Sequence, residues 1–443
     1  MSVERPNVIY LHSHDTGRHV GPYGYPVHTP NLQRLAGESL LYRQAFCCAP
    51  TCSPSRAALL TGQSPHASGM LGLHHRGFRL RDETQHLAHY LKTNGYATAL
   101  VGVNHIVEHP EHAGYDRVLP TDSHGAADVG PAAAAFLNGQ PREPFFFDIG
   151  FVETHRGRFP ARHPAEDPDY TQPIDGLPDE PRTREDATLF NSAARDLDTG
   201  IGQVLDALAA SGLAGRTLLI CTTDHGISFP GHKCTTRDGG IEVMLLMRGP
   251  ATASLPTGVA GGVCDALVSQ LDLYPMICDY LGLPPPPWLE GRSLLPLLRG
   301  DADAVRDEVF AEITFHAAYQ PERAVRTRRH KYVRRFGPPT PQPLSNLDDG
   351  LSKTVVAETG FADHTQPAEA LYDLILDADE RDNRVADPAY ADVLNDLRGR
   401  LDRWMHATHD PLLNGPVAPP PGTVVNAPAD YSAKDVLDRK PNA

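Results

Sequence analysis

The sequence is short of several features that mark whole classes of protein. Only 7 of its 443 residues are cysteine, an odd number with no obvious disulfide or zinc-site spacing. No stretch approaches the roughly 18 uninterrupted apolar residues of a membrane span, and residues 1–5 are not followed by an apolar signal region. We therefore expect free thiols and a soluble, unexported, cytoplasmic protein without a membrane partner.

Positive charge is also scarce. With 40 Lys and Arg against 55 Asp and Glu, the formal net charge is -15, which argues against a nucleic-acid partner. The densest basic run, Arg326 to Arg335, alternates enough to form a strand, and a solvated strand face is favoured over a polyanion patch. An anionic substrate must therefore be held by local positive charge.

Predicted strands and helices alternate over the first two thirds of the chain. Apolar runs predict strands at 7–13, 97–102, 144–150 and 216–223, and helical periodicity predicts helices at 29–40, 84–94 and 186–211. Such alternation implies a mostly parallel sheet with helices on both faces. The expected fold class is therefore α/β.

The pattern changes beyond about residue 305. Segments 308–314 and 324–335 are predicted strands and 390–405 is a predicted helix, which together suggest a small α+β subdomain. The last residues are rich in Pro, Ala and Asp and are predicted to be extended or disordered. We expect a catalytic domain at 1–304, the subdomain at 305–415 and an arm at 416–443, which could clasp a neighbour in a homo-oligomer.

The most informative motif is Cys52-Ser-Pro-Ser-Arg56. Ser53 can cap a helix and Pro54 suits its first position, which puts Cys52 at the helix N-terminus and Arg56 about one turn along. Free N–H groups and an Arg fork favour a tetrahedral oxyanion. Taken alone, the motif would be interpreted first as a buried cysteine before a helix that starts with Pro.

Two predicted strands end in pairs of metal-type residues. His14-Asp15 follows the first strand, and Asp224-His225 follows the strand that ends at Thr223. Functional groups in open α/β sheets gather at the carboxyl ends of strands. Each pair alone could be a turn or a cap, but two such pairs with Cys52 between them in sequence favour one divalent-cation site.

These motifs resemble a known family. From Pro6 to Pro250, with the signature at Cys52–Gly62, the chain resembles the formylglycine-dependent (type I) sulfatases of the alkaline phosphatase superfamily, and Glu369 to Asn383 resembles their C-terminal tract. The sulfamidase (heparan N-sulfatase)-like members are the nearest subgroup. This likeness lies in residues 39–46, 69–74, 226–230 and 404–411.

The resemblance implies a set of site residues. The implied metal ligands are His14, Asp15, Asp224, His225 and Cys52 after its conversion to formylglycine. Arg56 would hold the nucleophile and a sulfate oxygen, and His105 would lie beside the formylglycine. His155 and Lys233 would face the leaving group. The implied cofactor is one divalent ion, Ca²⁺ by resemblance, and the implied partner is a formylglycine-generating enzyme.

Three positions depart from the family pattern. Many members have Asp-Asp in place of His14-Asp15 and Asn in place of His225, and imidazole suits Mn²⁺, Zn²⁺ or iron better than Ca²⁺. Val103 replaces the Lys of the family's Gly-Lys-x-His tract, which removes one cation. Asn104 or a nearby histidine could compensate, or the preferred substrate could differ.

The expected chemistry is sulfuryl transfer to one hydroxyl of the hydrated formylglycine. His155 or Lys233 would protonate the departing atom, and His105 or another base would help to expel sulfate. We favour a sulfatase that acts on sulfate esters or sulfamates of small molecules or saccharides. The alternatives are a phosphonate monoester or phosphodiester hydrolase and a non-catalytic anion-binding protein.

Overall fold

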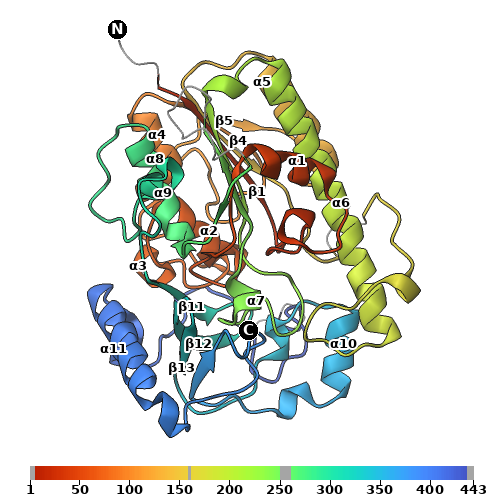
Figure 1. The fold of residues 1–443 in the computed structure, drawn as a ribbon, viewed down its shortest axis with the longest axis vertical. Helices are drawn as coiled ribbons and strands as arrows, with labels where there is room; N and C mark the ends of the chain where they lie inside the picture. Colours follow the sequence, from red (N-terminus) through yellow and green to blue (C-terminus); the bar gives the residue numbers. More distant parts are fainter. Residues whose placement is uncertain (1–4, 158–160, 250–260, 437–443) are drawn as a thin grey trace.

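The centre of the molecule is an eight-stranded sheet. A computed structural model describes residues 5–157, 161–249 and 261–436 (Figure 1). The strand order is β5-β4-β6-β1-β7-β8-β2-β9, in which β8 runs antiparallel to β7 and β2 and the other neighbours are parallel. The strands are β1 Asn7–Ser13, β2 Leu40–Tyr42, β4 Ala97–Gly102, β5 Arg117–Leu119, β6 Phe145–Gly150, β7 Thr217–Thr223, β8 Leu245–Arg248 and β9 Val263–Cys264. The predicted α/β class is confirmed.

The two central strands fix the position of the site. All residues of β1 and β7 are buried, as expected for parallel strands covered on both faces. Their register pairs Asn7 with Thr217 and Ser13 with Thr223. Both strands therefore end at the same level of the sheet, which places residues 14–15 beside residues 224–225.

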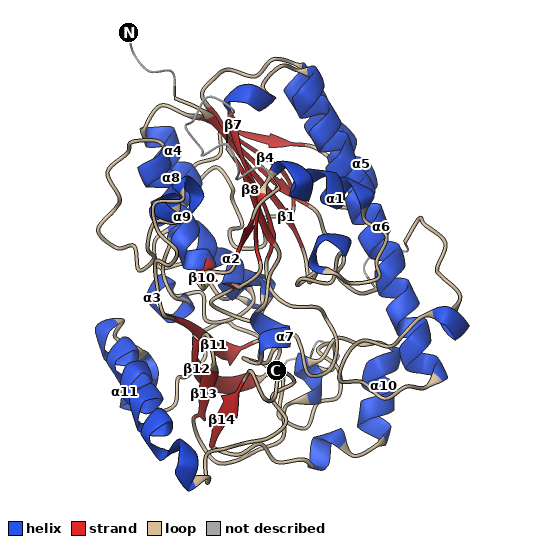
Figure 2. Cartoon of the chain, in the orientation of Figure 1, coloured by secondary structure: helices blue, strands red, loops and turns tan. Residues whose placement is uncertain are grey.

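Helices cover both faces of this sheet (Figures 1 and 2). One layer contains α1 Pro30–Glu38, α5 Ala126–Asn138 and α6 Pro181–Ala210; the other contains α2 Cys52–Thr61, α4 Leu87–Thr93, α8 Leu273–Tyr280 and α9 Leu295–Arg299. Helix α6 begins before the predicted residue 186 because Glu180 caps it and Pro181 occupies its first turn. The helix predicted at 84–94 is shorter, since Glu83–Gln85 form a 3-10 turn.

Short elements complete this part of the chain. Helix α3 is Pro65–Ser68 and α7 is Asp238–Ile241, while the strands β3 Ala45–Phe46 and β10 Val268–Ser269 form a small parallel pair. All seven cysteines are free, as predicted. Among the described residues, no helix is both long enough and apolar enough to cross a membrane.

A second sheet follows at one end of the molecule (Figure 2). It is antiparallel, with β11 Glu308–Phe315, β12 Tyr319–Thr327, β13 His330–Arg335 and β14 Glu369–Asp373 in sequence order. Helix α11 Ala391–Ala407 packs against it, and α10 Leu351–Glu358 lies near α6. The single strand predicted at 324–335 is wrong, because Thr327 exchanges hydrogen bonds with His330 and closes a turn between β12 and β13.

The basic run in this hairpin is not a simple solvated face. The Arg326 side chain is 6% exposed and the Lys331 side chain 0%, and both form ion pairs with Asp238 of α7. The expectation of a solvated strand face is therefore wrong for these two residues. Their charges join the second sheet to the segment that follows β7.

Over its described residues 416–436, the predicted C-terminal arm contains turns, bends and one bridge between Asn426 and Ala318, and no helix or longer strand. Residues 437–443 of the predicted arm lie outside the described residues. The described arm packs against its own chain: Arg76 donates to the carbonyl oxygen of Ala433 at 2.6 Å.

Candidate metal and nucleophile site

The ends of β1 and β7 and the start of α2 bring five potential ligands together. Each of the five offers one donor atom, and these atoms all lie within 4.8 Å of one another; the residues are His14, Asp15, Cys52, Asp224 and His225. All five are buried. The structure thus brings together every metal ligand that the sequence predicts.

Distances within this cluster are short. His14 Nδ1 lies 2.8 Å from Asp15 Oδ1 and 3.3 Å from Asp224 Oδ2. His225 Nε2 lies 3.1 Å from Asp15 Oδ1 and 3.4 Å from Cys52 Sγ. His225 Nδ1 lies 2.9 Å from the carbonyl oxygen of Gly226, so a proton on Nδ1 leaves the Nε2 lone pair facing the cluster.

The nucleophile position lies at the helix start, but the predicted cap is wrong. Helix α2 begins at Cys52, and the extended residue Thr51 precedes it. Ser53 is inside the helix, where its Oγ accepts a hydrogen bond from the backbone N–H of His74 at 3.0 Å. Thr51 Oγ1 instead pairs with His316 Nδ1 at 2.6 Å. This contact with a segment distant in sequence could not be read from the local pattern.

Arg56 is buried beneath the cluster. Its Nη2 donates to Asp224 Oδ2 and to the carbonyl oxygen of Ser13, both at 3.0 Å, and its Nη1 donates to His12 Nδ1 at 2.6 Å. Since His12 Nδ1 accepts, His12 Nε2 can donate to Asp148 Oδ1 at 2.9 Å. The guanidinium therefore fixes Asp224 and the end of β1.

Lys233 connects the cluster to an acid that sequence reasoning missed. Its Nζ lies 2.8 Å from Asp15 Oδ2 and 2.8 Å from Asp348 Oδ2. Asp348 follows β13 and comes from the second sheet's side of the molecule, far from every motif in sequence. No local signal marks it, because its partner is 115 residues away.

The two further predicted histidines flank the cluster. The His155 ring centroid lies 4.7 Å from that of His14, and the His105 centroid lies 5.7 Å from it. His105 Nε2 lies 3.0 Å from Nδ1 of His75, whose ring stacks on it. Within the described part of the chain, the buried Nδ1 of His105 has no hydrogen-bond partner.

Burial and the carboxylates shift the pKa values of these groups in opposite directions. Burial alone lowers the pKa of His14, but Asp224, Cys52 and Asp15 raise it to about 9. Burial lowers the pKa of His155 to about 4. Burial raises the pKa of the Cys52 thiol, yet Lys233 and His14 bring it down to about 7. The raised pKa of His14 reflects the negative charge that Asp224 and Asp15 concentrate at this cluster.

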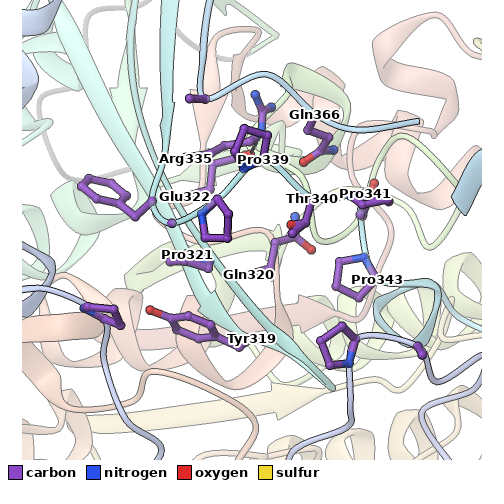
Figure 3. Close-up of a pocket in the computed structure, with 18 of the residues that line it drawn as sticks. Tyr319, Gln320, Pro321, Glu322, Arg335, Pro339, Thr340, Pro341, Pro343 and Gln366 are labelled. Atoms are coloured by element: carbon purple, nitrogen blue, oxygen red, sulfur yellow. Dashed lines mark ion pairs between the residues drawn. The ribbon is translucent and has the colours of Figure 1, made fainter. Parts of the chain in front are cut away.

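Two residues of the cluster, His14 and Cys52, line a cavity of about 450 Å³. Its walls include Cys52, His105, His155 and Lys233, together with Val103, the position where the family's Lys is missing. A larger cavity of about 650 Å³ lies between β12 and the Pro-rich loop around Pro339 and Pro341 (Figure 3), and none of the predicted site residues lines it. The volume of a cavity therefore does not by itself identify the functional site.

The fold and the cluster at the strand ends define an α/β enzyme of the alkaline phosphatase-like class. Residues 6–283 match the sulfatase family. The chain belongs to the sulfatase family, whose members hydrolyse sulfate esters or sulfamates. N-sulphoglucosamine sulphohydrolase of Homo sapiens is 30% identical over 467 residues, which cover 93% of this chain and 92% of that protein.

Solved structures agree on the fold. A 2-O GAG sulfatase has a TM-score of 0.75 at 21% identity, covering 94% of this chain and 96% of its own. A protein solved with its substrate D-glucosamine-2-N,6-O-disulfate has a TM-score of 0.71 at 17% identity, covering 93% of this chain and 99% of its own. The likeness thus extends over the second sheet as well as the central one.

Proposed function

We propose that this protein hydrolyses a sulfate ester or sulfamate of a saccharide, using residue 52 as nucleophile after conversion of its cysteine to formylglycine. The observation that carries the proposal is the position of Cys52 at the N-terminus of α2, with Sγ 3.4 Å from His225 Nε2 and 3.9 Å from Asp15 Oδ1. Formylglycine supplies the hydroxyl of a hydrated aldehyde, which a thiol cannot replace because sulfate must later be released. A formylglycine-generating enzyme is the partner that this modification requires.

The donor set fits one divalent metal ion. Two buried carboxylates, Asp15 and Asp224, converge with the imidazoles of His14 and His225, and Asp15 N donates to Asp224 Oδ1 at 2.8 Å. The ion would supply positive charge that acidifies a coordinated hydroxyl and stabilises charge on the sulfuryl oxygens. Family resemblance favours Ca²⁺, whereas the two imidazoles favour Mn²⁺.

The remaining residues have roles that follow from their contacts. Arg56 holds Asp224 in place and, although it does not line the cavity, adds positive charge near Cys52. Lys233 lies on the opposite side of Asp15 and, with His155, faces the leaving group, where one of them donates a proton to the departing oxygen or nitrogen. His105, which lines the same cavity as Cys52, takes a proton as sulfate leaves.

The substrate class rests on the relatives. The human relative is named for N-sulphoglucosamine, and one structural neighbour was solved with a sulfated glucosamine. A sulfated amino sugar is therefore our proposed substrate. We further propose a cytoplasmic enzyme, because its seven cysteines are all free. The division into a catalytic domain at 1–304, a subdomain at 305–415 and an arm at 416–443 stays a prediction.

The test compares the catalytic efficiency of purified protein on nitrophenyl sulfate, glucosamine N-sulfate and a phenylphosphonate ester. We expect hydrolysis of the sulfated compounds and weak or no activity on the phosphonate. A large preference for the phosphonate would overturn the proposal and restore the phosphonate hydrolase alternative. Activity unchanged in Cys52→Ala would refute the nucleophile, and no turnover of any compound would favour an anion-binding protein.

A further inference from the structure

The C-terminal arm forms part of the wall of the cavity that contains Cys52. Ala433 and Lys434 line this cavity together with Lys233. The arm reaches it because Arg76 holds it: Arg76 Nη1 donates to Asn426 Oδ1 at 2.9 Å, and Nη2 donates to the carbonyl oxygen of Ala433 at 2.6 Å. Arg76 is itself 6% exposed, so these contacts are shielded from water.

A second set of contacts fixes the residues just before Lys434. The buried ammonium of Lys353 donates to the carbonyl oxygen of Tyr431 at 2.8 Å and lies 4.5 Å from the centre of its ring. Ser432 Oγ donates to Asp349 Oδ2 at 2.7 Å. The backbone at 431–433 is therefore held by Arg76, Lys353 and Asp349, and Lys434 directly follows this anchored segment in sequence.

The other cations of this cavity already have partners. Lys233 pairs with Asp15 and Asp348. Arg156 pairs with Asp186 through Nη1 and lies 3.7 Å from the centre of the Phe229 ring, while its buried Nε and Nη2 have no hydrogen-bond partner among the described residues. Arg76 binds the arm.

Lys434 differs from these cations. Over residues 5–157, 161–249 and 261–436, no carboxylate lies within ion-pair distance of its ammonium group. It is exposed, as a side chain that meets a soluble ligand must be. Its charge acts on Asp349, which also lines the cavity. Burial raises the pKa of Asp349, but Lys353 and Lys434 help to hold it below its usual value.

We propose that Lys434 binds a second anionic group, a sulfate or a carboxylate, on the sugar that carries the scissile sulfuryl group. This inference rests on the proposed function, because that function places the scissile group at Cys52 and Lys233. An ammonium on a flexible stem can reach either oxyanion and requires no fixed fork geometry. Lys434 is thus a specificity-determining residue: it selects doubly charged sugars over singly charged ones and takes no part in bond breaking.

The experiment measures kcat/KM of wild type, Lys434→Ala, Lys434→Glu and Lys434→Arg on three sugars. These are glucosamine N-sulfate, glucosamine N,6-O-disulfate, and a disaccharide of N-sulfated glucosamine with a hexuronate. We expect Lys434→Ala to lower kcat/KM about five- to tenfold on one doubly charged sugar and to change the singly charged one little. Lys434→Glu should lower kcat/KM on that sugar further, and Lys434→Arg should retain the wild-type value. The sugar that responds identifies the group as sulfate or carboxylate.

A surface lysine provides the matched control. Lys92 pairs with Asp116 outside the cavity, so Lys92→Ala should leave all three values unchanged. Equal effects of Lys434→Ala and Lys434→Glu on all three sugars, or no effect on any, would overturn the inference while wild-type turnover upheld the proposed function. If wild type hydrolysed none of them, the proposed function would fail, and calorimetric Kd values for the same sugars would still decide the role of Lys434.

Discussion

The ammonium of Lys233 lies 2.8 Å from Oδ2 of Asp15, while Oδ1 of the same carboxylate lies 3.1 Å from His225 Nε2. One buried carboxylate thus connects the other potential metal ligands to Lys233, the cation that we propose faces the leaving group. Asp348 contacts Lys233 as well, so that the cation lies between two acids. A substitution at one end of this chain of contacts should therefore perturb the groups at the other end.

Replacing Lys233 by Ala should lower kcat about 10²- to 10³-fold, because charge on the leaving group would lose the cation that we propose faces it. It also leaves Asp15 and Asp348 buried without their shared partner. Steady-state kinetics checks this, and Lys233→Arg should retain part of the activity by keeping the charge. A kcat within twofold of wild type in Lys233→Ala would show that Lys233 lies outside the chemistry.

Cys52→Ala should lower turnover at least about 10³-fold, as expected for loss of a nucleophile. The variant should remain folded, since only a small buried side chain is shortened. Mass spectrometry of the wild-type peptide around residue 52 should show an aldehyde oxygen in place of sulfur. Active protein that retains an unmodified Cys52 would contradict this mechanism.

Chelation of divalent ions should lower both activity and the melting temperature. An ion at a hundred times its Kd stabilises the folded state by about 2.7 kcal/mol, and that contribution would be lost. The melting temperature with Ca²⁺, Mn²⁺ or Mg²⁺ added back checks which ion is preferred. His14→Asp should shift the preference toward Ca²⁺, because it replaces an imidazole by a hard oxygen ligand. A melting temperature that changes with neither the chelator nor the added ions would contradict a metal site at this cluster.

A second cluster of buried charges should stabilise the folded protein. Glu312 accepts from His66 at 2.9 Å and pairs with Arg323 at 3.0 Å, and Arg323 pairs with Asp410 at 2.6 Å. Glu312→Ala should lower the free energy of unfolding by about 3–5 kcal/mol, because buried positive charge loses a partner. Denaturant titration measures this.

The matched control for that change is an exposed pair. Arg34 and Asp206 lie 2.7 Å apart with side chains 44% and 67% exposed. Asp206→Asn should therefore change the free energy of unfolding by less than about 1 kcal/mol. Equal effects of the two substitutions would mean that the buried cluster gives no more stability than a surface pair.

Glu380 should make stability depend on pH. Burial raises its pKa to about 7, although Lys331, 2.8 Å away, opposes the shift. A carboxyl with a raised folded-state pKa gives stability that is fully present below its unfolded pKa, near 4.5, and is lost as pH rises through about 7. The free energy of unfolding of wild type minus that of Glu380→Gln should therefore decline as the pH rises from about 4.5 to about 7. A difference that is flat with pH would contradict the assignment.

Local sequence signals predicted the central elements well and the second sheet less well. The apolar run at 217–223 and the long periodic segment after residue 186 each appear as one strand and one helix. The turn at Arg328-Arg329 was missed because it contains no Gly, Pro, Asn or Asp, and the hairpin around it is closed by Thr327. The burial of Arg326 and Lys331 depends on Asp238, a partner from another element.

The sequence by itself determined which groups gather at the site. Parallel strands end at one edge of a sheet, so His14-Asp15 and Asp224-His225 had to lie near each other once both strands were recognised. The tertiary structure alone decided what surrounds them. Asp348 contacts Lys233 from the segment between β13 and β14, and the arm brings Lys434 to the cavity wall through contacts with Arg76 and Lys353. Periodicity and motifs report on neighbours along the chain, whereas these partners meet only through the packing of distant segments.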